Sequence, residues 1–409
     1  MFDNQNHAPS QGEQLAKPWV ERIMHNPYTL FEDRIQFWLQ VRTEWMTSPL
    51  VADSDTSSPP LPTDKYLCEC HGAQNEQSAL MDSSRISATA RYEMVALIVD
   101  AFYQAAALQV ETLLRQVGYG SPPAAYACVL FGSGGRREMT PWSDQDHGLL
   151  WADVPADQQA GAAIYFDKWG SVYTKLLARL GFPPCSGKVL ASEAEWRGSI
   201  SEWRQRIECW TQHLNWENMR YFSMSLDMRT CFGETCLEQQ WRAHLQQIHE
   251  QHGYELNKAI VSNLLHRKRA HNTFGQLICE RYGVNAGLFD IKYRAYVPIA
   301  QLARSSMWIS GRLNRSMATR ERLQTAIAIA HLLDDVSIKA AVSEVYQWWD
   351  DVLLSRWQAG GYQADGWWNC SGMVDPAVLP PARKMALRQN SHAITKWLRH
   401  LERRYTNEK

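Results

Sequence analysis

The residues best suited to catalysis or ligand binding lie in one stretch. It reads Phe131-Gly-Ser-Gly-Gly-Arg-Arg-Glu-Met-Thr-Pro-Trp-Ser-Asp-Gln-Asp146. Its two aspartates, Asp144 and Asp146, are two residues apart, and side chains at that spacing point to the same face of a strand. Two carboxylates on one face repel each other unless a cation lies between them. Because oxygen ligands of this kind favour Mg²⁺ or Mn²⁺, we expect Asp144 and Asp146 to share a divalent metal ion.

A glycine-rich turn precedes the acidic pair. Glycines that follow a strand let backbone N–H groups approach an anion closely, and a serine hydroxyl adds a further donor. Arg136 and Arg137 have two equal interpretations, either as a guanidinium clamp on a phosphate or as exposed turn residues. The turn residues expected to bind a nucleotide are Gly132, Ser133, Gly134 and Gly135.

A third carboxylate is expected from a neighbouring strand, because phosphoryl-type transfers commonly use two metal ions about 3.5–4 Å apart. The run 222–232 alternates in polarity, which predicts a strand. Asp227 stands in the middle of this run among apolar neighbours, where an unpaired carboxylate would be costly. We therefore expect Asp227 to join the acidic pair as a metal ligand, with Glu234 and Asp167 as the other available carboxylates.

The elements that position these residues form a short β region between helices. Strands are expected at 124–133, 144–151 and 222–232, and helices at 28–46, 84–117, 160–181, 193–213 and along most of the chain after about 237. This pattern predicts an α+β fold, with a small mixed sheet flanked by helices and followed by a C-terminal helical bundle. The expected boundaries are 1–82 for a helical and linker region, 83–235 for the sheet core with its leading helix, and 236–409 for the bundle.

The composition is that of an ordinary globular protein, with 45% hydrophobic and 21% charged residues. Because 42 Lys and Arg nearly balance 43 Asp and Glu, attraction of the whole protein to nucleic acid is not expected. No apolar run approaches the ~18 residues of a membrane-spanning helix, and the N-terminus lacks a hydrophobic signal core. We expect a cytoplasmic protein without a membrane partner.

The cysteines and one basic segment each have more than one interpretation. The nine cysteines are scattered and odd in number, which favours reduced thiols, and a metal at Cys68, Cys70 and His71 stays open because no second ligand pair follows at a convincing spacing. The segment 256–322 holds twelve Lys and Arg against three Asp and Glu. It is either a cationic face that attracts a nucleotide or an acidic acceptor, or a solvated helix surface.

The chemical motif resembles a known superfamily. The order Gly132-Ser, then Asp144-x-Asp146, then a later lone Asp227 is the pattern of the polymerase-β-type nucleotidyltransferases. The fuller string GSGGRREMTPWSDQDHGLL resembles the branch related to the N-terminal domain of the bacterial PII uridylyltransferase. The later string Phe289-Asp-Ile-Lys-Tyr-Arg resembles the helical substrate-binding domain of that branch, so the resemblance spans about 85–405.

The resemblance implies transfer of a nucleoside monophosphate from an NTP to an acceptor hydroxyl, with release of pyrophosphate. Ser133 and its backbone would hold the terminal phosphates, Asp144 and Asp146 would bind both metals, and Asp227 would bind the catalytic metal and help to deprotonate the acceptor. Lys292 and Arg294 become nucleotide-binding candidates, because the resemblance runs through them.

The acceptor is the open part of this interpretation. A regulatory protein of the PII type is the leading expectation, which would make the chain a uridylyltransferase-like signalling enzyme. A small-molecule acceptor of the aminoglycoside type would use the same chemistry, because the metals act on the triphosphate. A non-catalytic regulator that senses nucleotide is the alternative from another class.

Overall fold

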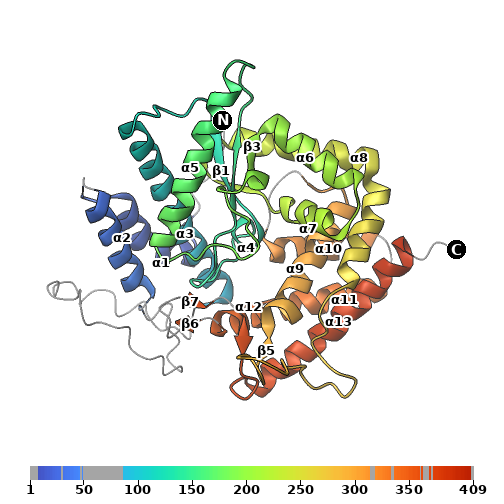
Figure 1. Cartoon of the computed structure of the whole chain (residues 1–409). Coiled ribbons are helices and arrows are strands. Elements are labelled where there is room, and N and C mark those ends of the chain that lie inside the picture. Colours follow the sequence, from blue (N-terminus) through green and yellow to red (C-terminus); the bar gives the residue numbers. More distant parts are fainter. Residues whose placement is uncertain are drawn as a thin grey trace.

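The computed structural model describes residues 8–28, 31–46, 48, 86–313, 318–332, 336–359, 361–362, 368–369 and 372–406. Helices surround one small sheet in these residues, which confirms the expected α+β class (Figure 1). The six cysteines within the described ranges are free, as expected of reduced thiols. Cys68, Cys70 and His71 lie outside the described residues.

The central sheet has four strands in the order β3-β2-β1-β4. These strands are β1 (Tyr126–Leu130), β2 (His147–Trp151), β3 (Arg197–Ser199) and β4 (Arg229–Gly233). β1 pairs antiparallel with both β2 and β4, whereas β2 pairs parallel with β3, so the sheet is mixed as predicted. Strands are thus confirmed within 124–133 and 144–151, but β2 begins only at His147, so Asp144 and Asp146 precede the strand in which they were expected. The three-residue β3 lies where the sequence predicted only helix.

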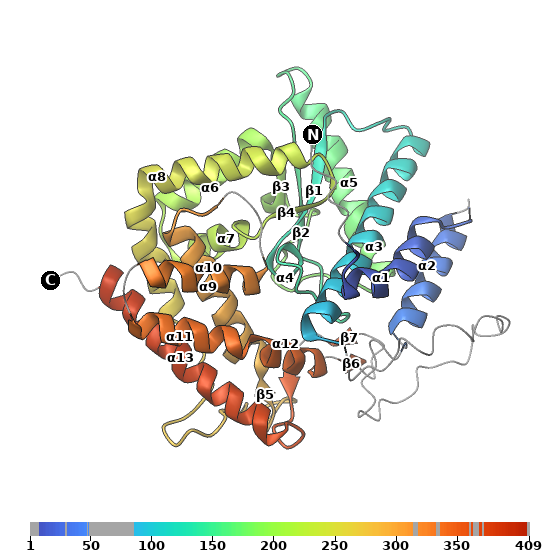
Figure 2. The ribbon, with the colours of Figure 1, turned by 180° about the vertical axis from the view of Figure 1, so that it is seen from behind.

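Helices cover both faces of the sheet, which is why β1 and β2 are buried along their whole length. Cys128 and Leu130 of β1 share a core with α3 (Ala88–Gln116) and α5 (Gln159–Arg179). The alternate residues Ala127 and Val129 pack in a second core with α6, α7 and α8. Figure 2 shows these two groups of helices on opposite sides of the strands. The ranges of the second group are α6 (Ile200–Gln212), α7 (Trp216–Ser225) and α8 (Thr235–Leu265).

The strand predicted over 222–232 is wrong in its first part, because α7 occupies residues up to Ser225 and β4 begins only at Arg229. The side chain of Asn215 caps α7 by accepting a hydrogen bond from the backbone of its first turn. Met219 and Phe222, three residues apart, are both buried, so the stretch also satisfies a helical period. Local capping and packing decided between two patterns that the sequence alone left close.

The long helix α3 is the one described helix that is apolar and long enough to cross a membrane by composition. However, 78% of its most apolar window is buried inside the protein. Its apolar character therefore reflects its position in the core, where α1 (Gln11–Met24) and α12 (Trp349–Gln358) also contact it.

The C-terminal part is mostly helical, as predicted, and its helices gather beside the sheet core (Figure 1). Its main helices are α9 (Val297–Ile309), α10 (Thr319–Leu332), α11 (Val336–Gln347) and α13 (Pro381–Tyr405), with the short η4 (Lys292–Tyr296) before α9. Small strand pairs accompany them, namely β5 (Phe289–Asp290) with β8 (Met373–Val374), and β6 (Gly361–Tyr362) with β7 (Trp368–Asn369). At the N-terminus, α1 is followed by α2 (Phe31–Met46). The boundaries expected between the three regions stay a prediction.

Candidate active site

The acidic pair lies directly before β2, next to the end of β1. The backbone N–H of Phe131 donates to the carbonyl of Asp146 at 3.0 Å, which continues the β1–β2 pairing to the aspartates. Gly132 begins the short turn α4 (Gly132–Gly135) with a φ of 52°. A Cβ added at Gly132 would lie 3.3 Å from Oδ2 of Asp146. The glycine turn and the carboxylate predicted to act together are therefore neighbours.

The environment of Asp146 leaves its negative charge poorly compensated. Burial, followed by the charge of Asp144, raises the pKa of Asp146 to about 7. A hydrogen bond from the Cys185 thiol and the charges of Lys292 and Arg136 oppose this shift without cancelling it. A pair of carboxylates with too little nearby positive charge is the setting in which a divalent cation binds, so Asp144 and Asp146 fit the metal predicted for them.

The four residues of the glycine turn divide into two exposed and two buried positions. Gly132 and Ser133 are partly exposed, whereas Gly134 and Gly135 are buried. A Cβ at Gly135 would lie only 1.9 Å from the backbone oxygen of Asp227, so this position requires glycine for close packing. The ligand-accessible part of the predicted phosphate turn is thus Gly132 with Ser133.

Asp227 lies in the turn between α7 and β4, and its side chain is fully buried among three arginines. Its Oδ1 accepts hydrogen bonds from Nε of Arg304 (3.1 Å) and Nη1 of Arg322 (2.6 Å). Its Oδ2 accepts from Nη1 of Arg136 and Nη2 of Arg304, both at 2.5 Å. Burial alone would raise the pKa of Asp227, but the charges of these three arginines hold it well below its usual range.

The structure does not join Asp227 to the acidic pair. Within the described part of the chain, no three His, Cys, Asp or Glu side chains are grouped so that they could hold a metal ion. Asp167, a second candidate, is paired with Arg197 instead. The metal-binding role of Asp227 stays a prediction, and it requires the arginines to release a carboxylate that already accepts four N–H groups.

Glu138 is a second buried acceptor next to Asp227. Its carboxylate accepts from Nε of Arg136 (3.0 Å), the hydroxyl of Tyr296 (2.8 Å) and the backbone N–H of Thr319 (2.6 Å). Arg356 donates to the carbonyl of Glu138 at 2.5 Å and stacks over the Tyr296 ring. These contacts link Glu138, shortly after the glycine turn, to η4, α10 and α12 of the C-terminal part.

We call the four buried guanidinium groups around these two carboxylates the arginine cluster; they are Arg136, Arg304, Arg322 and Arg356. Sequence analysis considered only Arg136 among them, with a phosphate clamp as one interpretation. In the structure its guanidinium is instead committed to Asp227, Glu138 and Tyr296. Arg304 belongs to the basic segment 256–322, and no local feature of the sequence distinguished it from the other arginines there; the structure shows it buried.

The remaining residues predicted to bind nucleotide differ in how they relate to the acidic pair. Lys292 is close enough to Asp146 for its charge to lower the pKa of that carboxyl. Arg294 instead donates to the backbone oxygen of Arg269 (2.6 Å) and to Glu280 (2.9 Å), which ties down the preceding loop. Arg137 ends the glycine turn with an exposed side chain and a φ of 59°.

A glycine turn beside paired carboxylates on a small mixed sheet, with a helical region packed against it, is the arrangement of a nucleotidyltransferase. Residues 75–217 match the family model named "Putative nucleotidyltransferase DUF294", and residues 255–405 match the one named "Putative nucleotidyltransferase substrate binding domain". The chain belongs to this nucleotidyltransferase family, which confirms the resemblance seen in its sequence. A comparison with curated proteins finds no match.

Proposed function

We propose that the protein transfers a nucleoside monophosphate from an NTP to an acceptor hydroxyl, with Mg²⁺ or Mn²⁺ held by Asp144 and Asp146. The observation that carries this proposal is the undercompensated acidic pair in contact with the glycine turn. A bound cation would supply charge stabilisation for the phosphoryl oxygens. The family membership supports the reaction class.

The residues around the pair have matching roles in this proposal. Gly132 and Ser133, the accessible part of the turn, would donate hydrogen bonds to phosphate oxygens. Lys292, whose charge already acts on Asp146, would balance part of the charge of the triphosphate. In this way the chain would provide both hydrogen-bond donors and a positive charge for the phosphates near the carboxylates.

We propose a regulatory protein of the PII type as the acceptor, in the cytoplasm, on the strength of the sequence resemblance. A small molecule is the alternative acceptor for the same chemistry. A non-catalytic nucleotide sensor is the competing proposal, and one observation favours it: Asp227 is saturated by three arginines.

Pyrophosphate release tests the proposed reaction. Each NTP is supplied with Mg²⁺ and either a PII-type protein or an aminoglycoside, and wild type is compared with Asp144→Asn and Asp146→Asn. We expect both variants to lose at least about a hundredfold in rate, because loss of a metal ligand removes much of the charge stabilisation of the transition state. Asp157→Asn, an exposed aspartate in a loop, is the matched control.

Activity that survives both substitutions would refute the metal-dependent mechanism. Tight NTP binding without pyrophosphate release for any acceptor would favour the sensor. A catalytic role for Asp227 makes a distinct prediction, namely that Asp227→Asn binds NTP within a few-fold of wild type but loses transfer.

A further inference from the structure

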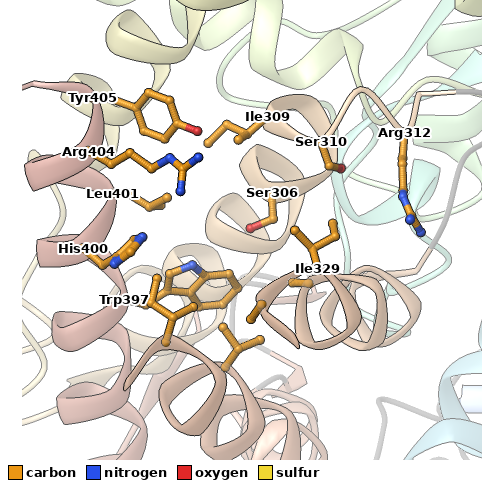
Figure 3. Close-up of a pocket in the computed structure, with 14 residues that line it drawn as sticks. Ser306, Ile309, Ser310, Arg312, Ile329, Trp397, His400, Leu401, Arg404 and Tyr405 are labelled. Carbon is orange, nitrogen blue, oxygen red and sulfur yellow. The ribbon is translucent and has the colours of Figure 1, made fainter. Parts of the chain in front are cut away.

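A cavity of about 360 Å³ lies among four helices of the C-terminal part, α9, α10, α11 and α13 (Figure 3). Its volume is near the lower end of the about 300–1,000 Å³ that is typical of small-molecule sites. Apolar side chains form most of its wall, chiefly Ile309, Ile329, Ile338, Val342, Trp397 and Leu401. None of its lining residues belongs to the glycine turn or the acidic pair, so this is a separate site.

Polar side chains line the cavity from two directions, Ser306 and Ser310 from α9 and its end, and His400, Arg404 and Tyr405 from α13 (Figure 3). Figure 3 shows the side chains of Arg404 and Tyr405 reaching from α13 toward the side of α9 that carries Ser306 and Ile309. The lining contains two arginines, Arg404 and Arg312, and no Asp or Glu among the described residues. As far as the described residues line it, the cavity thus offers an apolar surface with positive charge and no carboxylate.

Arg404 is the residue best placed to select a ligand. Its guanidinium forms no ion pair with any carboxylate in the described ranges, and its Cζ lies 5.8 Å from the centroid of the Tyr405 ring. An arginine without a carboxylate partner at the edge of an apolar cavity suits a planar anion, which it can bind through two parallel N–H donors.

We propose that this cavity binds a small organic acid, with an apolar body of one or two rings or a short alkyl chain and a single anionic group held by Arg404. The apolar body packs on Trp397 and the isoleucines, where its burial supplies most of the affinity. A nucleoside triphosphate does not match this chemistry, because its charged phosphates would face an apolar wall. The proposal therefore goes beyond the nucleotide site and does not depend on it.

Two fluorescent probes with the same aromatic body test the proposal on the full chain. Anilinonaphthalene sulfonate carries an anionic group, and phenylnaphthylamine lacks it. We expect the sulfonate to bind at one site per chain and Arg404→Gln to weaken it about tenfold, as expected for loss of a charged hydrogen bond. Binding of phenylnaphthylamine should change less than twofold in the same variant.

The control is Arg403→Gln, which removes the same charge from the neighbouring residue, exposed like Arg404 but not lining the cavity. A second variant, Ile329→Trp, fills the cavity and should abolish binding of both probes while thermal unfolding verifies its fold. Three results would overturn the proposal: no saturable binding of the sulfonate to wild type, an equal loss in Arg403→Gln and Arg404→Gln, or unchanged binding in folded Ile329→Trp.

Discussion

The two ends of one glycine turn lie next to two aspartates whose side chains experience opposite electrostatics. Gly132, at the start of α4, faces the side chain of Asp146, and Gly135, at its end, packs on the backbone of Asp227. The pKa of Asp146 is raised to about 7 by burial and by Asp144. The pKa of Asp227 is held low despite burial, because Arg304, Arg136 and Arg322 surround it.

The acidic pair therefore has too little positive charge around it, whereas Asp227 has positive charge in excess. Nearby positive charges offset the negative charge at Asp146 only in part, and a bound cation would offset the rest. Around Asp227 and Glu138, in contrast, the arginine cluster provides four positive charges for two negative ones. Because Arg304 belongs to α9 and Arg322 to α10, the second region attaches the C-terminal helices to the sheet core.

The largest effect is expected from Asp227→Asn. This change leaves three buried guanidinium groups without their shared carboxylate, so the free energy of unfolding should fall by about 3–5 kcal/mol. Urea denaturation at neutral pH measures the loss. The matched change Asp157→Asn, on an exposed loop, should stay within about 0.5 kcal/mol of wild type.

A loss below about 1 kcal/mol in Asp227→Asn would contradict the attachment role. It would mean that the arginines find other partners, and that Asp227 is freer to serve the acidic pair than its hydrogen bonds suggest. The electrostatic difference between Asp146 and Asp227 would then no longer hold.

A smaller effect is expected from added Mg²⁺ on wild type. The proposed metal site predicts that a cation binds the folded acidic pair and not the unfolded chain. Mg²⁺ at 100 times its dissociation constant should then stabilise the protein by about 2.7 kcal/mol. Thermal unfolding with and without Mg²⁺ measures this gain. Asp144→Asn should lose it, whereas Asp157→Asn should keep it; a gain of equal size in all three proteins would place the ion elsewhere.

The sequence predicts the first region better than the second, for a physical reason. Asp144 and Asp146 are local to each other, because a single residue separates them along the chain, although they lie just before β2 and not within it. The partners of Asp227 are remote, since Arg304 is 77 positions and Arg322 95 positions away along the chain. No local pattern records such contacts, and they depend on how α9 and α10 pack.

The strand expected at 222–232 failed for a related reason. Alternating polarity and a helical period fit its few residues almost equally well, and the buried contacts of Met219 and Phe222 determine the outcome. The turn that follows α7 then aims Asp227 at the arginine cluster. Asp227 therefore lies in a turn and not in the middle of a strand, while its metal-binding role stays a prediction.

The smallest effect is expected in how the free energy of unfolding depends on pH through Asp146. Its folded pKa of about 7 lies above the ordinary value of 3.8, so the folded state binds this proton more tightly than the unfolded state. The resulting stability is present below about pH 4 and is lost as pH rises toward and through 7.

In the presence of a chelator, Asp146→Asn should therefore be more stable than wild type at pH 8 by about 1–3 kcal/mol, with a smaller difference at pH 5. Denaturation at the two pH values measures this, with Asp157→Asn as the control that retains the wild-type slope. An Asp146→Asn variant that is less stable than wild type at pH 8 would show that the charge of Asp146 is compensated after all, which would remove the electrostatic contrast with Asp227 and the main reason to expect a cation at the acidic pair.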